Sequence, residues 1–441
     1  MTFENLQNVM RDNGIVGCGG AGFPSYAKLN KDVDTILINC AECEPLLRLH
    51  RQLIEKKTVE ILQACQLIAE TIGAKQVIIG IKAAYPKAVD SIRAHIESFP
   101  LIKIHLLNEV YPAGDEVVLI YEATKRVVQP GKLPASVGVI VYNVETVYNV
   151  YEALNNRPVT HKYVTIAGEI KNPSTFYAPI GCKFSELIKL AGGETLSDVD
   201  YLMGGPMMGY IGSDNDVVTK TSNAVIVLPK THPTVLRKRT RATVDLKRAM
   251  ACCCQCNYCT DMCPRHLLGH PIDPAEFMRV ASNQDSKNIM PYLDSVYCSG
   301  CGVCEAFACP QGLSPRNLLG IIKGTLRSNG VKVPPFEGVA DAHSARELRE
   351  LPLQRLISRL GLDKYNVSAP IIDDEVEVKE VKILTKQNVG APTKPIVKVN
   401  DLVKVGDVIA VAQDGALCVN IHASINGKVI DVNDRNITIR K

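Results

Sequence analysis

The residues best suited to chemistry are eight cysteines in the third quarter of the chain, which form two closely spaced runs. The first run reads C-x2-C-x2-C-x3-C-P, and the second has one extra residue before its last cysteine; the members are Cys253, Cys256, Cys259, Cys263, Cys298, Cys301, Cys304 and Cys309. Three thiolates at this spacing can hold one face of a cubane cluster, so the runs predict iron–sulfur centres that transfer electrons. Zinc and disulfides are the alternatives, but zinc ribbons use paired C-x2-C knuckles rather than a triple followed by C-P.

The last cysteine of each run precedes a proline, which directs that cysteine away from its own run. In ferredoxins with two clusters, such a cysteine ligates the neighbouring cluster. We therefore expect Cys309 to complete the first [4Fe–4S] cluster and Cys263 to complete the second. Cys252 and Cys254 adjoin the first run, but using either as a ligand would break its spacing.

A second motif is the glycine-rich stretch GCGGAGFP, which begins at Gly17 and is followed by Lys28. Glycines at this density let backbone N–H groups approach phosphate oxygens, and a nearby lysine adds a point charge. No strand clearly precedes the stretch, so it is not the usual Rossmann fingerprint and is weak evidence when taken alone.

Three polar motifs strengthen that evidence, because each follows a strand-like segment. They are NCAECEP from Asn39, YPAGDE from Tyr111 and NVET from Asn143. Open α/β sheets bind their ligands beyond the carboxyl ends of the strands. The four motifs together therefore predict a nucleotide-type site at one sheet edge.

The first 158 residues alternate strand-like and helical patterns. Strands are expected at 35–39, 76–81, 103–107 and 138–142, and helices at 52–72 and 87–98. This alternation predicts βαβ units and a mostly parallel sheet with helices on its faces.

The middle of the chain predicts smaller units. Short alternating strands and one helix at 185–191 indicate a small α+β module. The basic stretch 230–248 could dock an anionic partner, but its composition favours a solvated linker. Between the cysteine runs, Asp273-Pro274 predicts a helix start, because an N-cap residue precedes a proline at the first helical position. A polar helical linker is expected at 342–360.

The last seventy residues show two β-rich halves and resemble the barrel-sandwich of lipoyl and biotinyl carriers. Such carriers attach their prosthetic group to a lysine at a hairpin tip. Here the tip is Asp414-Gly415-Ala416, and no lysine occurs from Val411 to Gly427. Attachment is therefore chemically impossible, which predicts a structural or docking module.

Composition restricts the function further. The 441 residues carry a net charge of +4, with 50 basic and 46 acidic side chains, so no overall field attracts nucleic acid. No apolar run reaches the ~20 residues of a membrane helix, and the first residues lack a secretory pattern. Sixteen cysteines without export indicate a reducing compartment, so we expect a cytoplasmic protein without a membrane span.

In their order along the chain, the glycine-rich motif with Lys28, NCAECEP, GDE and NVET resemble the flavin-bearing, NADH-oxidising subunit of respiratory complex I. They resemble still more the RnfC-like family and its PduS-type cobalamin reductases, over essentially the whole chain. RnfC proteins carry the barrel-sandwich at the N-terminus, whereas here it is C-terminal, as in PduS-type proteins. The resemblance implies a multidomain α/β protein: a Rossmann-like FMN/NADH domain (1–158), an SLBB β-grasp domain (159–235), a helical ferredoxin domain with two [4Fe–4S] clusters (245–330), a linker (331–370) and a barrel-sandwich hybrid domain (371–441).

Carried over residue by residue, the resemblance places the FMN phosphate on the glycine loop with Lys28, and Glu42 and Glu44 beside the nicotinamide nucleotide. The residues implied in cofactor binding are Gly17, Gly19, Gly20, Gly22, Phe23, Lys28, Asn39, Glu42, Glu44, Tyr111, Gly114, Asp115, Glu116, Asn143 and Thr146. One departure is Tyr142, which stands where the complex I pattern has a second asparagine.

The implied activity is electron transfer from NADH through FMN and two [4Fe–4S] clusters to a one-electron acceptor. From the PduS resemblance, we expect cobalamin, free or on a corrinoid protein such as an adenosyltransferase, in propanediol utilisation inside a bacterial microcompartment with shell proteins as partners. An RnfC-like subunit of a membrane ferredoxin:NAD oxidoreductase is one alternative. A non-catalytic electron-transfer scaffold is the other.

Overall fold

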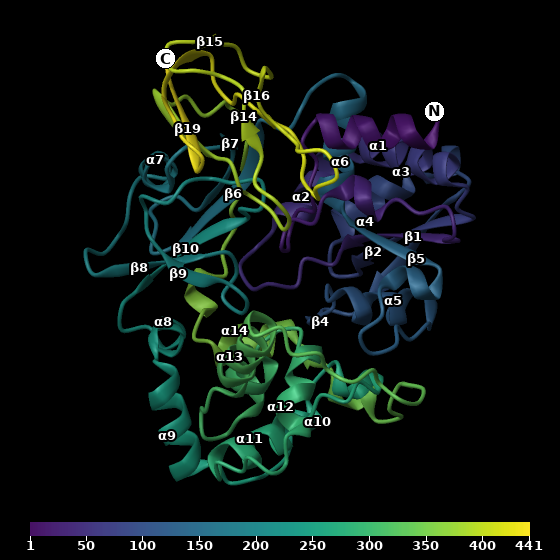
Figure 1. Ribbon diagram of the computed structural model, residues 1–441, viewed down its shortest axis with the longest axis vertical. Coiled ribbons are helices and arrows are strands. Elements are labelled where there is room, and N and C mark those ends of the chain that lie inside the picture. The colour runs from purple at the N-terminus through teal and green to yellow at the C-terminus, as the bar shows by residue number, and fades with distance from the viewer.

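The computed structural model describes residues 1–441 and shows a mixed α/β protein (Figure 1). Its N-terminal part is built on a parallel four-stranded sheet with the order β3-β2-β1-β5. The strands are β1 (Thr35–Cys40), β2 (Gln76–Lys82), β3 (Ile102–Leu107) and β5 (Val139–Asn143). Each agrees with its predicted range to within one residue at either end. Their runs of Ile, Val and Leu are mostly buried, as is usual for parallel strands covered on both faces.

Helices cover both faces of this sheet. On one face lie α1 (Phe3–Asp12), α3 (Thr58–Ile72) and α6 (Val144–Leu154), and on the other lies α5 (Glu116–Thr124). Side chains alternate across a strand, so Ile36 and Ile38 join the core under the first three helices while Leu37 packs with α5.

Two predicted helices differ from the structure. The single helix expected at 52–72 is two helices, α2 (Leu49–Lys56) and α3, because the backbone of Lys57 leaves the helical region (φ −126°, ψ 34°). The apolar spacing hides this break because both helices bury side chains in the same core. The helix expected at 87–98 ends early: α4 covers Pro86–Arg93, and a 3₁₀ turn follows at Ile96–Ser98.

The second unit is a six-stranded sheet with the order β12-β7-β6-β10-β8-β9 and the helix α7 (Phe184–Leu190). The strands are β6 (His161–Gly168), β7 (Ser174–Pro179), β8 (Val199–Met203), β9 (Tyr210–Gly212), β10 (Ala224–Pro229) and β12 (Ile371–Ile372). Strand β12 pairs in parallel with β7, so a segment far along the chain completes this sheet.

The cysteine runs lie in a helical unit. Its helices are α8 (Pro233–Arg239), α9 (Ala242–Cys252), α10 (Tyr258–Asp261), α11 (Pro274–Ser282), α12 (Met290–Leu293) and α13 (Pro315–Ser328). The predicted helix start is confirmed, because the Asp273 carboxylate accepts from the N–H of Glu276 at 2.8 Å.

The basic stretch 230–248 is mostly exposed, as expected of a solvated linker, but it is not irregular. Instead, α8 and α9 occupy it, and the Lys238 ammonium donates to the carbonyls of Met207 (3.0 Å) and Gly209 (2.6 Å). These acceptors follow β8, far from Lys238 in the sequence, so the charges of the stretch itself could not predict them. Of the helical linker predicted at 342–360, only α14 (Leu353–Arg359) is an α-helix; β11 (Leu351–Pro352) pairs with β4 (Val110–Tyr111).

The C-terminal domain consists of two small antiparallel sheets, β13-β19-β18-β15 and β14-β16-β17. The strands are β13 (Glu380–Leu384), β14 (Lys394–Pro395), β15 (Leu402–Val403), β16 (Val408–Val411), β17 (Ile421–His422), β18 (Gly427–Val432) and β19 (Asn436–Arg440). The hairpin tip at 414–416 contacts the N-terminal domain: Arg11 pairs with Asp414 at 3.5 Å, and the Tyr26 hydroxyl donates to the Ala416 carbonyl. No helix in the structure combines the length and apolarity needed to cross a membrane.

A buried ion pair joins the first two units. Glu145, on α6, contacts Lys162, on β6, and both side chains are at most 2% exposed. A buried charge without a partner destabilises the folded state. Removing one residue of the pair should therefore lower the free energy of unfolding more than removing both.

We expect Lys162→Met to lower the free energy of unfolding by about 3–5 kcal/mol, since it leaves the Glu145 carboxylate buried without a partner. The double variant Glu145→Leu/Lys162→Met should recover most of that loss. Chemical denaturation followed by circular dichroism measures both. A double variant as unstable as the single one would contradict the ion-pair argument.

Candidate functional site

A cavity of about 410 Å³ opens beside the carboxyl ends of β1 and β5. Asn39 and Asn143, the polar residues at these ends, are register partners on the two strands. All fifteen residues that the sequence assigned to a cofactor line this cavity: Gly17, Gly19, Gly20, Gly22, Phe23, Lys28, Asn39, Glu42, Glu44, Tyr111, Gly114, Asp115, Glu116, Asn143 and Thr146. Their roles in binding stay predictions.

The glycine loop has the features of a phosphate cradle. The Gly17 N–H donates to the Phe23 carbonyl at 2.9 Å and closes the loop, and the Cys18 N–H donates to the Thr146 hydroxyl at 2.9 Å. The N–H groups from Gly19 to Gly22 donate to no protein acceptor. Free N–H groups on a glycine turn suit phosphate oxygens, so the loop fits the phosphate of FMN.

The two asparagines at the strand ends fix the cavity walls. The Asn39 side chain donates to the Gly114 carbonyl at 2.9 Å, which joins β1 to the turn before α5. The Asn143 side-chain oxygen caps α6 by accepting from the Glu145 N–H at 2.9 Å, and its nitrogen lies 3.3 Å from Nε2 of His50. The Asn39 oxygen also accepts from the Ala41 N–H at 3.1 Å, so both atoms of each amide have partners within the protein.

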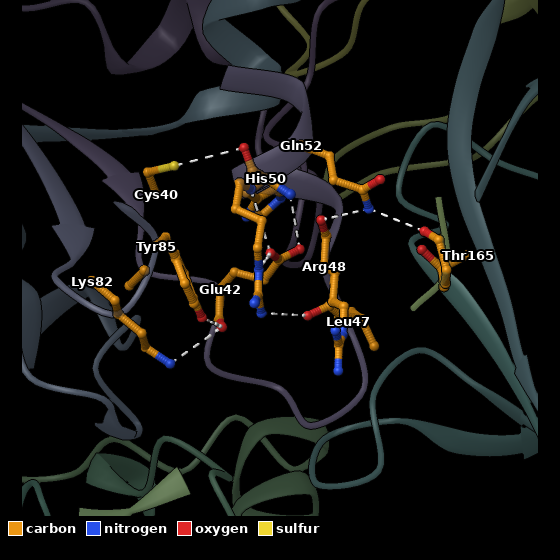
Figure 2. A network of polar contacts seen from close by, with 12 residues as sticks. Cys40, Glu42, Leu47, Arg48, His50, Gln52, Lys82, Tyr85 and Thr165 are labelled. Atoms are coloured by element: carbon orange, nitrogen blue, oxygen red, sulfur yellow. Dashed lines mark hydrogen bonds and ion pairs between the residues drawn. The ribbon is translucent and has the colours of Figure 1, made fainter. Parts of the chain in front are cut away.

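Glu42 is buried and holds the start of α2 rather than extending into solvent (Figure 2). Its carboxylate accepts from the N–H of His50 at 2.8 Å, and its carbonyl accepts from Lys82 and Tyr85, each at 3.4 Å. Glu44 instead reaches the second unit, where it accepts from the N–H groups of Met207 (2.9 Å) and Met208 (2.8 Å). Burial raises the pKa of Glu44 despite these two donors.

Several buried polar atoms on the cavity wall have no partner within the protein. They are Ser25 Oγ, His50 Nδ1 and Asn223 Oδ1. Since buried polar atoms in proteins are normally hydrogen-bonded, these three fit a polar ligand such as the flavin ring system. The sequence motifs include none of the three. Ser25 directly follows the glycine motif, whereas no local signal marks His50 or Asn223.

Three cysteines lie in or beside this region: Cys18 and Cys40 are buried, and Cys43 is half-buried. Burial raises the pKa of Cys18 to about 12 and that of Cys43 to about 11, and it raises the pKa of Cys40 still further. These thiols therefore stay protonated near neutral pH and behave as small apolar groups.

The eight cluster cysteines gather in the two sets expected from their spacing. Cys253, Cys256, Cys259 and Cys309 line one small cavity. Burial raises the pKa of Cys259 to about 12, and the other three thiols add to that effect because they are close. An N–H group of the adjacent turn, that of Leu313, donates to the Cys309 sulfur at 3.3 Å.

The second set consists of Cys263, Cys298, Cys301 and Cys304. Burial and Glu305 raise the pKa of Cys304, and the thiols of the other three cysteines raise it further. The Gly300 N–H donates to the Cys298 sulfur at 3.3 Å, a contact of the kind that tunes cluster potentials. Each set thus brings together four thiols, the number that ligates a [4Fe–4S] cluster, and the role of these cysteines as ligands stays a prediction.

The second set adjoins the cavity. Cys301 lies in the cavity wall, and the Tyr111 hydroxyl donates to the Cys301 carbonyl at 2.6 Å. Asp115, also in the wall, pairs with Arg265 at 3.0 Å, two residues after Cys263. The first set lies beyond it, and its Cys256 is exposed.

Family models match four parts of the chain in the expected order. They describe a Nuo51 FMN-binding domain (residues 10–152), an SLBB domain (163–211), a 4Fe-4S dicluster domain (252–314) and an RnfC barrel sandwich hybrid domain (363–441). The predicted multidomain fold class, FMN and the iron–sulfur clusters are therefore confirmed, and the zinc alternative is not supported.

Curated relatives match the full length. Cobalamin reductase PduS of Salmonella typhimurium is 38% identical over 442 residues, which cover 100% of this chain and 97% of that protein. The chain belongs to the PduS family. The Citrobacter freundii member is 37% identical, with coverage of 99% and 96%. The family is one of oxidoreductases, so the predicted enzyme class is confirmed.

More distant relatives match in part. A component of the Na(+)-translocating ferredoxin:NAD(+) oxidoreductase complex of Acetobacterium woodii is 30% identical, with coverage of 63% of this chain and 61% of that protein. A solved structure of an NAD+-reducing [NiFe]-hydrogenase in the H2-reduced state aligns with a TM-score of 0.51 at 16% identity, over 75% of this chain and 68% of that chain. At this identity the likeness concerns the fold alone.

We expect Cys309→Ala to remove the cluster held by the first cysteine run, and Cys263→Ala to remove the cluster held by the second run, because each completes the other set. The variants Cys256→Ala and Cys301→Ala should eliminate the same two clusters, respectively. EPR spectra and iron content of anaerobic protein measure the effect. Cys252→Ser and Cys254→Ser serve as controls that keep both clusters, and a cluster lost in either control would overturn the ligand assignment.

Proposed function

We propose that this oxidoreductase passes electrons from NADH, through FMN in the 410 Å³ cavity and two [4Fe–4S] clusters, to cobalamin. FMN when bound supplies the exchange between a two-electron hydride donor and one-electron carriers, which clusters alone lack. The observation that carries the proposal is the shared cavity: the glycine loop forms one wall and Cys301 forms another. Full-length similarity to cobalamin reductases supports the choice of acceptor.

Glu42 and Glu44, which the resemblance assigns to the nicotinamide nucleotide, contribute by shaping the wall of the cavity. The carboxylates of Glu42 and Glu44 already accept backbone N–H groups, so they shape the cavity rather than pair with a ligand cation. Phe23 is 37% exposed and lines the cavity, which supports a contact between its ring and a flat ligand. The match to the Nuo51 FMN-binding domain, together with the resemblance to the NADH-oxidising subunit of complex I, supports NADH as the donor.

The first cysteine set supplies the exit to the acceptor. A surface hollow beside it is lined by Cys256, Tyr258, Phe307, Ala308, Pro310 and Arg359. An exposed ligand cysteine within an apolar hollow gives a one-electron acceptor close access to that set. From the family resemblance we extend the proposal to cobalamin presented by an adenosyltransferase within a microcompartment.

Anaerobic mixing of the protein with NADH and cob(II)alamin should produce the cob(I)alamin spectrum. NADH alone should bleach the flavin and then the clusters, which absorbance at flavin and cluster wavelengths follows. Absence of any NADH-dependent bleaching would refute the proposed donor. Bleaching without cob(I)alamin, but with rapid transfer to a ferredoxin, would favour the RnfC-like alternative.

The placement of the two cysteine sets also predicts an order of transfer. In Cys301→Ala, NADH should still bleach the flavin but leave the first-set cluster oxidised, although dithionite reduces it. In Cys256→Ala, NADH should still reduce the second-set cluster, while reduction of cob(II)alamin falls at least tenfold. Freeze-quenched EPR distinguishes the two. Equal reduction of the first-set cluster by NADH in Cys301→Ala would reverse the order.

A further inference from the structure

The glycine loop is held by a second domain as well as by its own. The N–H of Val389, in the C-terminal domain, donates to the carbonyl of Ala21 at 3.0 Å. At Gly22, where φ is +73°, an added Cβ would lie 3.0 Å from Cβ of Asn388 and 2.5 Å from the methyl group of Thr221. The outer side of the loop therefore rests on the C-terminal domain and on the turn before β10.

That part of the C-terminal domain is itself anchored at a junction of three domains. The Gln387 side-chain oxygen accepts from the N–H of Lys220 at 2.9 Å. The Lys220 ammonium, which is fully buried, donates to the carbonyls of Gly14 (2.7 Å) and Asn420 (2.8 Å). Gly14 precedes the glycine loop, and Gln387 precedes Val389. Lys220 therefore holds the chain segments on both sides of the hydrogen bond between Val389 and Ala21.

The hydrogen bond from Val389 to the Ala21 carbonyl sets the direction of the next N–H group, that of Gly22. A trans peptide is planar, so its carbonyl and the next N–H point in opposite directions. When Val389 holds the Ala21 carbonyl, it directs the N–H of Gly22 away from the C-terminal domain. This N–H is one of those without a protein acceptor, and Gly22 lines the cavity.

We propose that residues 387–389 form a latch that holds the glycine loop in its phosphate-binding shape, and that retaining FMN through its phosphate is a function of the C-terminal domain. This inference rests on the proposed position of the FMN phosphate, and it is independent of the electron donor and acceptor. The domain has other attachments that do not touch the loop, such as the Ser424 hydroxyl donating to the Ile180 carbonyl at 2.6 Å. The contact with the glycine loop is therefore separate from the contacts that attach the C-terminal domain to the rest of the protein.

The test compares FMN with riboflavin, which lacks the phosphate. Val389→Pro removes the N–H, and Val389→Ala keeps it. We measure the dissociation constants of flavin-free protein for both flavins by fluorescence quenching. Val389→Pro should weaken FMN binding about tenfold, the equivalent of one lost hydrogen bond, and leave riboflavin binding unchanged. Val389→Ala should bind both flavins as the unsubstituted protein does.

Proline at position 389 could also disturb the local backbone, so a second variant tests the latch without introducing proline. Gln387→Ala keeps the Val389 N–H but loosens the anchor, so it should also weaken FMN selectively. Ser424→Ala is the matched control, because it removes a contact of the same domain away from the loop. Iron content and the EPR signals of both clusters report that each variant is folded.

Each outcome decides one question. If the unsubstituted protein binds FMN and riboflavin equally, the phosphate position proposed above is wrong. If it prefers FMN and Val389→Pro keeps that preference, the latch is refuted. Equal weakening of both flavins in Val389→Pro and Gln387→Ala would also refute it, because it would indicate a general loss of structure.

Discussion

The hydrogen bond from the Tyr111 hydroxyl to the Cys301 carbonyl joins the cavity to the second cysteine run, and the proposed path of electrons depends on this junction. Asp115 supports the junction, because it caps α5 through the N–H of Val117 and also pairs with Arg265 beside the cysteines. A single short segment of the N-terminal domain therefore shapes the cavity and positions the ferredoxin domain. The separation of the cavity from the second cysteine set is thus fixed by direct contacts between the two domains.

Buried lysines occur repeatedly where domains and elements meet. Lys82, Lys162 and Lys220 are the largest side chains that are fully buried. Each ammonium reaches a carbonyl or carboxylate on another element. A buried ammonium is costly unless such acceptors satisfy it, so each junction is stable only in the arrangement that brings them together.

The sequence predicts the parts of the site whose chemistry is local. The spacing of Cys253 to Cys259 predicts a cluster whatever the remaining fold, and Asn39 and Asn143 follow strands that periodicity identifies. Contacts between distant segments could not be predicted in this way. The break at Lys57 leaves the apolar pattern intact, and the carbonyl acceptors of Lys238 lie some thirty residues away along the chain. His50 and Asn223 show no local signal, because only folding leaves their polar atoms without partners on the cavity wall.

The hairpin tip at 414–416 differs from the equivalent tip in lipoyl and biotinyl carriers, which share the barrel-sandwich fold. In carrier proteins the tip swings on a tether and delivers a reactive group between active sites, so it must remain free. Here Arg11 and Tyr26 fix the tip to the N-terminal domain. The tip that lacks the attachment lysine thus lies in contact with another domain. A fold that delivers a tethered group in carrier proteins here contributes a contact surface for the neighbouring domain, and the proposed relay of electrons uses no swinging arm.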